Sequence, residues 1–395
     1  MKKLPIGLQD FKEIITEGYA YVDKTRYIHT MLTQGKNYFM SRPRRFGKTL
    51  TVSTLHYLFK GEKELFKDTW IYDQWDFKPH PVIRMSMTEL TNESPESVRS
   101  SLAHQLKQRY AAYGLEYDNV DYKQLFSSLI KKLSAREKVV ILIDEYDRPM
   151  LTHMGDPETA KAVRRIMQEF YLVIKDADAY LKMVFLTGIT KISKAGIFST
   201  LNHLDELTTK EAYASMLGYT REELEATFNE RLEEGSAKLN ISRDELLAKI
   251  KDYYNGFSFD GKHFVYNPFS ILNFFSEYEF RNYWMQSGLP SSLAEYAKTH
   301  TLKPEDYLGT YLHADVLTSY EIEQAPPESF LFQSGYLTFK EKDPEMGYLL
   351  DYPNREVRDS FSRLVLESAY AMDARTRNHL QQNIIVALRK REFQP

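Results

Sequence analysis

The segment that most constrains the fold is the run Arg-Pro-Arg-Arg-Phe-Gly-Lys-Thr at residues 42–49. A short apolar run at residues 38–40 precedes it, and residues 50–61 follow with leucines and aromatics at helical spacing. Gly61 is placed to end that helix. A strand, a loop with Gly-Lys-Thr and a helix, in this order, are typical of a phosphate-binding P-loop.

A P-loop binds anions through backbone amides and the positive end of its helix. In such a loop the lysine, here Lys48, reaches the outer phosphates, and the threonine, here Thr49, ligates Mg²⁺. The consensus has a glycine five residues before Gly47, where this chain has Arg42. We predict that the phosphates of ATP contact Arg44, Arg45, Phe46, Gly47, Lys48, Thr49 and Leu50.

The second strong pattern is an unbroken apolar run, residues 139–143, that ends in Asp144 and Glu145. Such a run predicts a strand buried on both faces, as in a parallel sheet between helices. Carboxylates there are costly to bury unless a cation partners them. We predict that Thr49 and Asp144 hold Mg²⁺ and that Glu145 polarises the attacking water. The alternative is a core strand that merely ends in an acidic turn.

Polar side chains also follow a predicted strand at residues 180–188. Thr187, Thr190 and Lys191 are candidates for sensing the γ-phosphate, and we assign that role to Lys191; an ordinary solvated strand end is the alternative for each. Strands alternating with helices predict a doubly wound α/β domain with ligands at the carboxyl ends of its strands. The other predicted elements are a strand at 81–87 and helices at 94–113, 122–133 and 157–179.

Composition bounds the class of protein. The 395 residues are 43% hydrophobic, carry a formal net charge of -3 and include no cysteine. Disulfides and thiolate chemistry are therefore excluded, and no global attraction to nucleic acid or membranes is expected. Polar residues interrupt the N-terminal sequence before it could form the apolar region of a signal peptide. No apolar run approaches the roughly 18 residues of a membrane span. We predict a cytoplasmic protein without a membrane partner.

The composition changes near residue 205, where a helical region begins. Residues 220–223 and 242–245 read as capping boxes, Asp260-Gly261 as a hairpin turn, and Asn267-Pro268 as a helix start. A further capping box is expected at 292–295. We predict three domains, a P-loop ATPase core at 1–204, a helical lid with a small hairpin at 205–300 and a winged-helix-like domain at 301–395.

The winged-helix prediction rests on a helix end at 330–335, two strands at 336–339 and 347–352, and a helix from residue 354. Winged-helix units bind DNA in some proteins and only pack against neighbours in others, and both alternatives stay open. The basic cluster at 389–391 reads as a solvated helix end.

Taken together, these segments resemble the AAA-ATPase-like proteins of bacteria and archaea, relatives of the STAND-type P-loop ATPases. The resemblance implies an ATP-binding core, a lid and a winged-helix-like segment, and it makes Arg42 a family trait. Many members continue into a PD-(D/E)XK nuclease domain, whose motif is not evident here. The matching segments are residues 21–25, 42–50, 144–147, 186–191, 197–199, 254–257, 265–270, 332–338 and 352–357.

Three functions follow as hypotheses. The first is Mg²⁺-dependent ATP hydrolysis with Lys48, Glu145 and Lys191 as catalytic residues, driving or gating nucleic-acid processing or defence. The second is a nucleotide-gated signalling switch with slow or no turnover. The third is a scaffold that no longer binds ATP, because Arg42 removes a glycine and Pro43 removes an amide donor. Expected partners are ATP or ADP, with nucleic acid, a nuclease domain and further copies of the chain left open. Arg148, Arg164 and Arg165 are candidates for an arginine finger.

Overall fold

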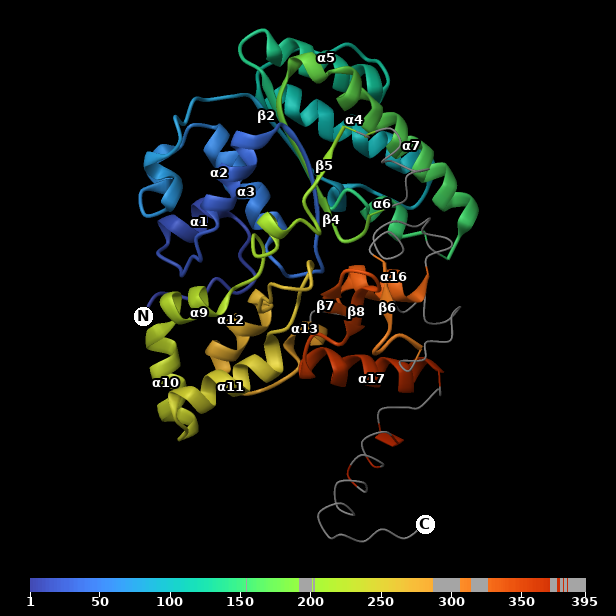
Figure 1. The fold of residues 1–395 in the computed structure, drawn as a ribbon. Coiled ribbons are helices and arrows are strands. Elements are labelled where there is room, and N and C mark those ends of the chain that lie inside the picture. The colour runs from blue at the N-terminus through green and yellow to red at the C-terminus, as the bar shows by residue number, and fades with distance from the viewer. Residues whose placement is uncertain are drawn as a thin grey trace.

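The structure, a computed structural model, describes residues 1–153, 155–191, 201, 203–286, 306–313 and 326–369, with isolated positions 375, 376, 379 and 382. Figure 1 shows the α/β core above, with the helical lid and the C-terminal unit side by side below it. Three segments for which the sequence made predictions lie outside the described residues: 197–199, the capping box at 292–295 and the basic cluster at 389–391.

The core is built on a five-stranded sheet in the order β2-β3-β4-β1-β5, and all its pairings are parallel. The strands are β1 (Asn37–Ser41), β2 (Val82–Ser86), β3 (Val139–Asp144), β4 (Leu181–Gly188) and β5 (Asp205–Glu206). The P-loop follows β1 and the acidic pair ends β3, so both lie at one edge of the sheet. This confirms the predicted α/β class with a mostly parallel sheet. The sheet continues through β5, just past the expected domain limit at residue 204.

Helices cover both faces of this sheet (Figure 1). Along β3, Val140 and Leu142 pack into the apolar cluster that contains α3, whereas Ile141 and Ile143 pack into the cluster that contains α4, α5 and α7. The strand is therefore buried on both sides, as its unbroken apolar run predicts. The helices of the core are α1 (Phe11–Thr16), α2 (Thr25–Gln34), α3 (Lys48–Phe59), α4 (Pro95–Ala112), α5 (Tyr122–Ser134), α6 (Arg148–Leu151) and α7 (Pro157–Asp176). Short 3-10 helices are η1 (Lys63–Phe66), η2 (Trp70–Asp73), η3 (Met87–Glu89), η4 (Asp178–Tyr180) and η5 (Glu211–Tyr213).

The lid begins its helices where the sequence predicts. Thr220 and Glu223 form a reciprocal capping box, and Asn267 accepts a hydrogen bond from the amide of Ser270. The predicted hairpin is reduced to a single bridge between Phe257 and Val265. The helices are α9 (Arg221–Thr227), α10 (Asn229–Leu239), α11 (Arg243–Tyr254), α12 (Pro268–Glu277) and α13 (Tyr283–Gln286).

The C-terminal unit contains a three-stranded antiparallel sheet in the order β6-β8-β7 between two helices. The Asp343 carboxylate accepts hydrogen bonds from the amides of Glu345 and Met346, which closes the turn between β7 and β8. The helix, hairpin and helix appear in the predicted order; their classification as a winged helix stays a prediction. The elements are β6 (Tyr311–Leu312), α16 (Pro327–Ser334), β7 (Thr338–Asp343), β8 (Gly347–Asp351) and α17 (Arg355–Ala369).

The three parts of the chain share one apolar cluster. Phe46 of the P-loop packs edge-on against Phe257, at 4.9 Å between ring centroids, and Trp284 packs against Tyr336 at 5.0 Å. The expected domain limits therefore divide a chain whose parts are packed together, and they stay a prediction.

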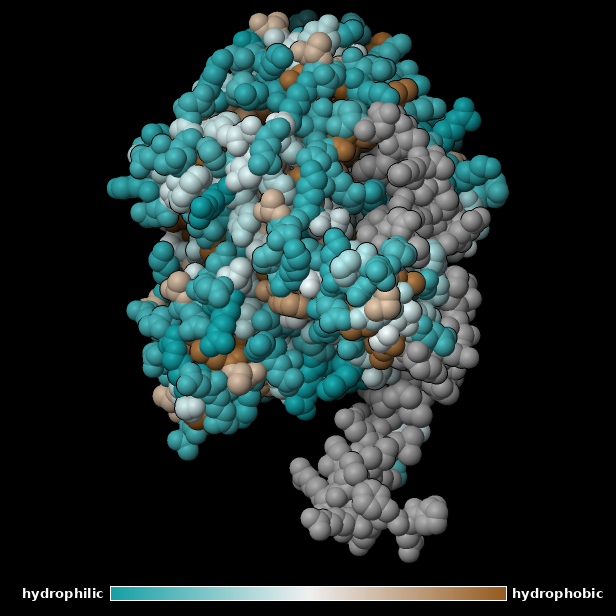
Figure 2. All heavy atoms as spheres, viewed as in Figure 1, coloured by the Kyte–Doolittle hydropathy of each residue, from teal (hydrophilic) through white to brown (hydrophobic). Residues whose placement is uncertain are grey.

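The face shown in Figure 2 is mostly hydrophilic, with apolar residues in small areas. Among the described helices, none has both the length and the apolarity that a membrane span requires.

Candidate functional site

The P-loop leaves β1 at Ser41 and enters α3 at Lys48. Arg45 (φ 69°) and Gly47 (φ 93°) have left-handed backbone conformations, which turn the chain sharply into the helix. A Cβ atom on Gly47 would meet nothing within 4 Å. Glycine is therefore required there for its backbone conformation, and the space beside it is open.

The amino end of α3 has no side-chain cap. The first amides of α3 thus meet no capping oxygen, and the helix dipole adds partial positive charge at the same place. This end of α3 is suited to bind an anion. Other helices do begin at a side chain that accepts a backbone N–H, among them Ser94, Asp121, Asp156, Ser242 and Asn267.

A cavity of about 390 Å³ opens beside this helix end. Its size lies within the range of small-molecule sites. The walls come from five parts of the chain: the N-terminal segment, the P-loop, the turn after β2, the end of β3 with the turn that follows it, and the lid. The lining residues include Pro5, Gly7, Leu8, Gln9, Arg44, Arg45, Gly47, Lys48, Thr49, Leu50, Thr88, Glu145, Arg148, Tyr219, Pro268, Phe269 and Leu272.

Lys48 lies on the wall of this cavity and is only 7% exposed. Its Nζ donates hydrogen bonds to the carbonyl oxygens of Arg42 and Pro43, at 2.9 Å each. A lysine ammonium has three donors, so one is left for a ligand. Burial lowers the pKa of Lys48, while the nearby Glu145 and Asp144 act in the opposite direction.

The two carboxylates at the end of β3 have different surroundings. Asp144 is 4% exposed, and its Oδ1 accepts a hydrogen bond from the amide of Glu145 at 3.0 Å. Glu145 lines the cavity and has a left-handed backbone conformation, with φ 50°, which is unusual for a residue with a side chain. Burial raises the pKa of Glu145, and Lys48 opposes that shift. A carboxylate with a raised pKa beside an open cavity is suited to accept a proton.

The residues present fit a magnesium ion. The hydroxyl of Thr49 has no hydrogen-bond partner within the described residues, and the Asp144 carboxylate uses one oxygen for a backbone amide. No group of three or more His, Cys, Asp and Glu side chains with metal-binding geometry occurs in the described part of the chain. Mg²⁺ does not need one, because it is commonly bound by one or two carboxylates together with water and substrate phosphates.

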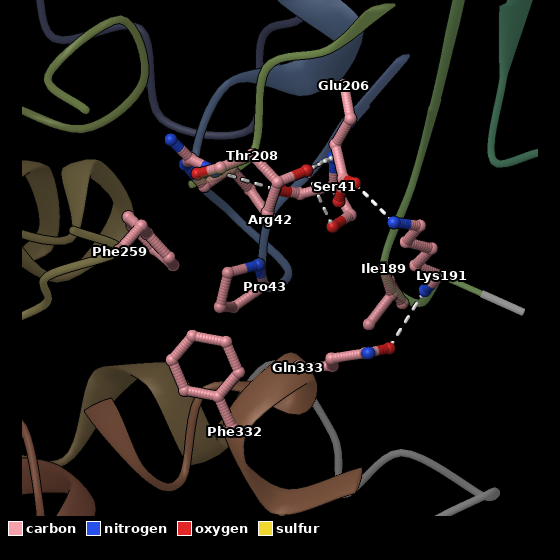
Figure 3. Close-up of a pocket in the computed structure, with 10 residues that line it drawn as sticks. All are labelled: Ser41, Arg42, Pro43, Ile189, Lys191, Glu206, Thr208, Phe259, Phe332 and Gln333. Atoms are coloured by element: carbon pink, nitrogen blue, oxygen red, sulfur yellow. Dashed lines mark hydrogen bonds and ion pairs between the residues drawn. The ribbon is translucent and has the colours of Figure 1, made fainter. Parts of the chain in front are cut away.

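Arg42, which replaces the consensus glycine, turns away from this cavity. It is 1% exposed, and its guanidinium donates to the carbonyl oxygens of Thr208 at 2.7 Å and Tyr213 at 3.3 Å. It also lies 3.9 Å over the ring of Phe259. Figure 3 shows Pro43 next to Phe332 of α16, and both residues, with Arg42 and Phe259, line a cavity of about 10 Å³. We call the side of the P-loop that faces the large cavity its front and the side that carries Arg42 its rear. The departure from the consensus therefore contributes to packing at the rear and leaves the front open.

Lys191 lies on the same rear side (Figure 3). Its Nζ pairs with Glu206 of β5, and its backbone amide donates to Gln333 Oε1 of α16 at 2.8 Å. The structure does not bring Lys191 to the wall of the large cavity. The other two candidates bond to the sheet and its loops: Thr187 Oγ1 donates to the Met40 carbonyl oxygen, and Thr190 Oγ1 donates to Asp147.

Sequence reasoning missed the N-terminal and lid residues of the cavity. Gly7 to Gln9 come before any recognisable motif. Phe269 lies in the matching segment 265–270 and Leu272 in the helix predicted to start there, and the sequence assigns neither a role in a site. Asp23, in the matching segment 21–25, accepts hydrogen bonds from the amides of Thr25 and Trp70 and does not line the cavity. The helix start at Asn267 was the one local signal near this wall.

A P-loop after β1, an acidic pair after β3 and an all-parallel sheet between helices define a P-loop nucleotide-binding protein. The family described as "Predicted AAA-ATPase" matches residues 5–198. An uncharacterized protein in the vnfD 5' region of Azotobacter chroococcum mcd 1 is 36% identical over 376 residues, which cover 92% of this chain and 70% of that protein. The chain belongs to this family of predicted AAA-ATPases. No solved structure matches it.

Proposed function

We propose that the protein binds ATP with Mg²⁺ and hydrolyses it. The observation that carries the proposal is the cavity at the uncapped end of α3, where Lys48 and Glu145 face the same space. Arg44, Arg45, Lys48 and Arg148 line this wall together with one carboxylate, Glu145, so positive side chains outnumber negative ones and a triphosphate would balance them. Charge-assisted hydrogen bonds to phosphate are among the stronger ones.

The residues divide into binding and chemical roles. The amides of residues 47–50 and the remaining donor of Lys48 bind the β- and γ-phosphates. Thr49 and Asp144 hold Mg²⁺, which neutralises phosphate charge when bound. Glu145 orients the attacking water and accepts its proton. Lys191 pairs with Glu206, so a role at the γ-phosphate requires this ion pair to open when nucleotide binds.

Two variants test the proposal. Lys48→Ala should lose Mg-ATP binding in calorimetry, because the cavity loses the cation nearest the helix end. Glu145→Gln should keep affinity within about threefold and lose most turnover, since the side chain keeps its size but cannot accept a proton. Unimpaired turnover in Glu145→Gln contradicts the assignment of the base. If the wild type shows no saturable Mg-ATP binding, the scaffold hypothesis replaces the ATPase.

The second candidate is a nucleotide-gated switch with little turnover. It is favoured by the contacts behind the P-loop, where Trp284 Nε1 donates to the Arg44 carbonyl oxygen at 3.4 Å and Lys191 bonds to Gln333. A phosphate that moves the loop would also move these contacts. Nucleotide retained through purification, turnover below about one per hour and a nucleotide-dependent change in proteolysis of the C-terminal unit favour this alternative.

A role in nucleic-acid processing or defence, and a nucleic-acid or nuclease partner, stay predictions. They rest on the resemblance and on the helix, hairpin and helix of the C-terminal unit. Binding of duplex DNA should weaken steeply as salt increases, because phosphate contacts release counterions. Absence of salt-dependent binding, measured by fluorescence anisotropy with and without ATP, counts against a DNA partner.

A further inference from the structure

Among the arginines near the acidic strand, the structure separates one from the others. Arg164 and Arg165 belong to α7, and neither lines the cavity. The side chain of Arg165 is 82% exposed and lies 3.5 Å from Glu169 on the next turn of its helix. Arg148 alone of the three lies on the cavity wall.

The backbone of Arg148 is held in place. Its amide donates to the carbonyl oxygen of Glu145 at 2.9 Å, so the proposed base and the arginine share one turn. Asp147, between them, is 1% exposed and accepts hydrogen bonds from the amides of Ile189 and Thr190 and from the Thr190 hydroxyl. This anchors the turn to the loop after β4, and the arginine is presented to the cavity from a fixed position.

Within the part of the chain that the structure describes, the side chain of Arg148 has no protein partner for its charge. Within the described residues its guanidinium makes no ion pair and no hydrogen bond. It is half-buried and near enough to Arg44 that the two like charges oppose each other; burial first, and then Arg148, lowers the pKa of Arg44. Glu145 is the one carboxylate among the residues named on this wall, and it makes no ion pair with Arg148 within the described residues. Two guanidinium groups that face one cavity favour a ligand with several negative oxygens.

The placement of the cations suggests different tasks. Arg44 and Lys48 belong to the P-loop, which holds the phosphates before and after reaction. Arg148 comes from the turn that carries Glu145, the side from which water must approach. In phosphoryl transfer an arginine on that side stabilises the charge that develops on the transferred group.

We propose that Arg148 is a catalytic arginine that acts in cis, so that the hydrolytic site is complete within one chain. This inference rests on the proposed ATPase function. The water oxygen bonds to the γ-phosphorus as the bond from phosphorus to the β–γ bridging oxygen breaks, and ADP and phosphate leave. Glu145 takes the proton of the water, while Arg148 donates hydrogen bonds to the γ-phosphoryl oxygens and transfers no proton.

The test compares Arg148→Ala and Arg148→Lys with the surface control Arg165→Ala. We expect Arg148→Ala to keep Mg-ATP affinity within about threefold while turnover falls on the order of 10³-fold. It should also lose the preference for ADP with aluminium fluoride over ADP alone, because that complex mimics the transition state. Arg148→Lys should recover part of both effects, since it keeps the charge. Arg165→Ala should behave as wild type.

The number of chains needed for hydrolysis is measured separately. Turnover per chain of wild type should not change with protein concentration. A mixture of Arg148→Ala, which has an intact P-loop, with Lys48→Ala, which has an intact arginine, should stay inactive. Activity restored by mixing overturns the inference, because the arginine then acts on a neighbouring copy.

Two other outcomes separate the inference from the function on which it rests. Wild-type turnover in Arg148→Ala overturns the role of Arg148 and leaves the ATPase intact. Absence of Mg-ATP binding by the wild type overturns both. Because Arg148→Lys preserves the charge and most of the volume, it keeps the test decisive if the alanine variant unfolds.

Discussion

The two sides of the P-loop differ in how their positive charges are satisfied. On the front, Arg44, Lys48 and Arg148 line a cavity of about 390 Å³. On the rear, Arg42 is almost fully buried, bonds to backbone carbonyl oxygens and lies over the ring of Phe259. The positive side chains at the front are therefore available to bind a ligand. The positive charge at the rear, on Arg42, instead makes contacts within the protein that connect the core to the lid.

This difference explains how a loop can lose its consensus glycine and keep an anion site. The position of Arg42 precedes the turn, where the chain still follows β1 and its amide bonds to Gly188 of β4 at 3.2 Å. A side chain there points behind the loop. The left-handed backbone conformations that shape the anion site at the start of α3 come later in the chain, at Arg45 and Gly47.

The largest effect is expected from Arg42→Gly, which restores the consensus residue. The variant should unfold more easily, by about 3 kcal/mol, because it leaves a buried void and carbonyl oxygens without donors. Its affinity for Mg-ATP should not improve. Chemical denaturation and calorimetry measure the two quantities. Unchanged stability with tighter ATP binding would show that Arg42 belongs functionally to the front.

Arg44→Ala should have the opposite profile. Loss of one charged contact on the front should weaken Mg-ATP binding by about 2 kcal/mol, roughly thirtyfold, with little change in unfolding. Arg99→Ala is the matched control, since Arg99 is on the surface of α4, away from the cavity, and pairs with Glu96 on its own helix. Equal affinity in Arg44→Ala and Arg99→Ala would remove Arg44 from the binding site.

Gly335→Ala probes the contact between the P-loop and the C-terminal unit. Gly335 has φ +90°, and an added Cβ would lie 2.7 Å from Cβ of Pro43. Gly309 also has a positive φ, +71°, but nothing lies within 4 Å of its Cβ position. Gly309→Ala therefore measures backbone strain alone. We expect Gly335→Ala to be less stable than this control by about 1.5 kcal/mol. Equal free energies of unfolding for the two variants would mean that the contact between Gly335 and Pro43 can shift at no cost.

Glu356→Gln is expected to have the smallest effect of the set on folding stability when it is measured at pH 5. Glu356 of α17 is fully buried, accepting hydrogen bonds from the amide of Trp284 at 2.7 Å and the hydroxyl of Ser270 at 2.8 Å. Burial raises the pKa of Glu356 from 4.5 to about 8, against these hydrogen bonds. The folded state therefore binds a proton that the unfolded state releases, and wild-type stability falls as pH rises from 4.5 to 8.

Glutamine imitates the protonated acid, so the variant lacks this dependence. Near pH 5 the two proteins should differ by less than about 1 kcal/mol. As the pH approaches 8, Glu356→Gln should become the more stable protein in thermal unfolding. Parallel pH profiles for the two proteins would mean that Glu356 does not link protonation to the packing of lid and C-terminal unit.

Much of the fold could be predicted because its signals are local. The unbroken apolar run before Asp144 requires burial on both faces, and it became β3, an interior strand of the sheet that pairs with β2 and β4. Thr220 and Asn267 cap helices because a side-chain oxygen reaches amides two or three residues away. The hairpin near Asp260 was less regular than its turn suggested. There the Asp260 carboxylate accepts the amides of Lys262 and His263 and holds the loop itself.

The candidate site divides in the same way. By itself, the sequence determined the strand, the loop and the helix of the P-loop and the acidic pair after β3, since periodicity, caps and a short motif act over a few residues. Only the tertiary structure decided that Arg42 faces the rear, that Lys191 pairs with Glu206 and that Arg148 reaches the cavity. The direction of a long charged side chain depends on which distant carbonyl oxygens, carboxylates or open spaces the fold brings within its reach.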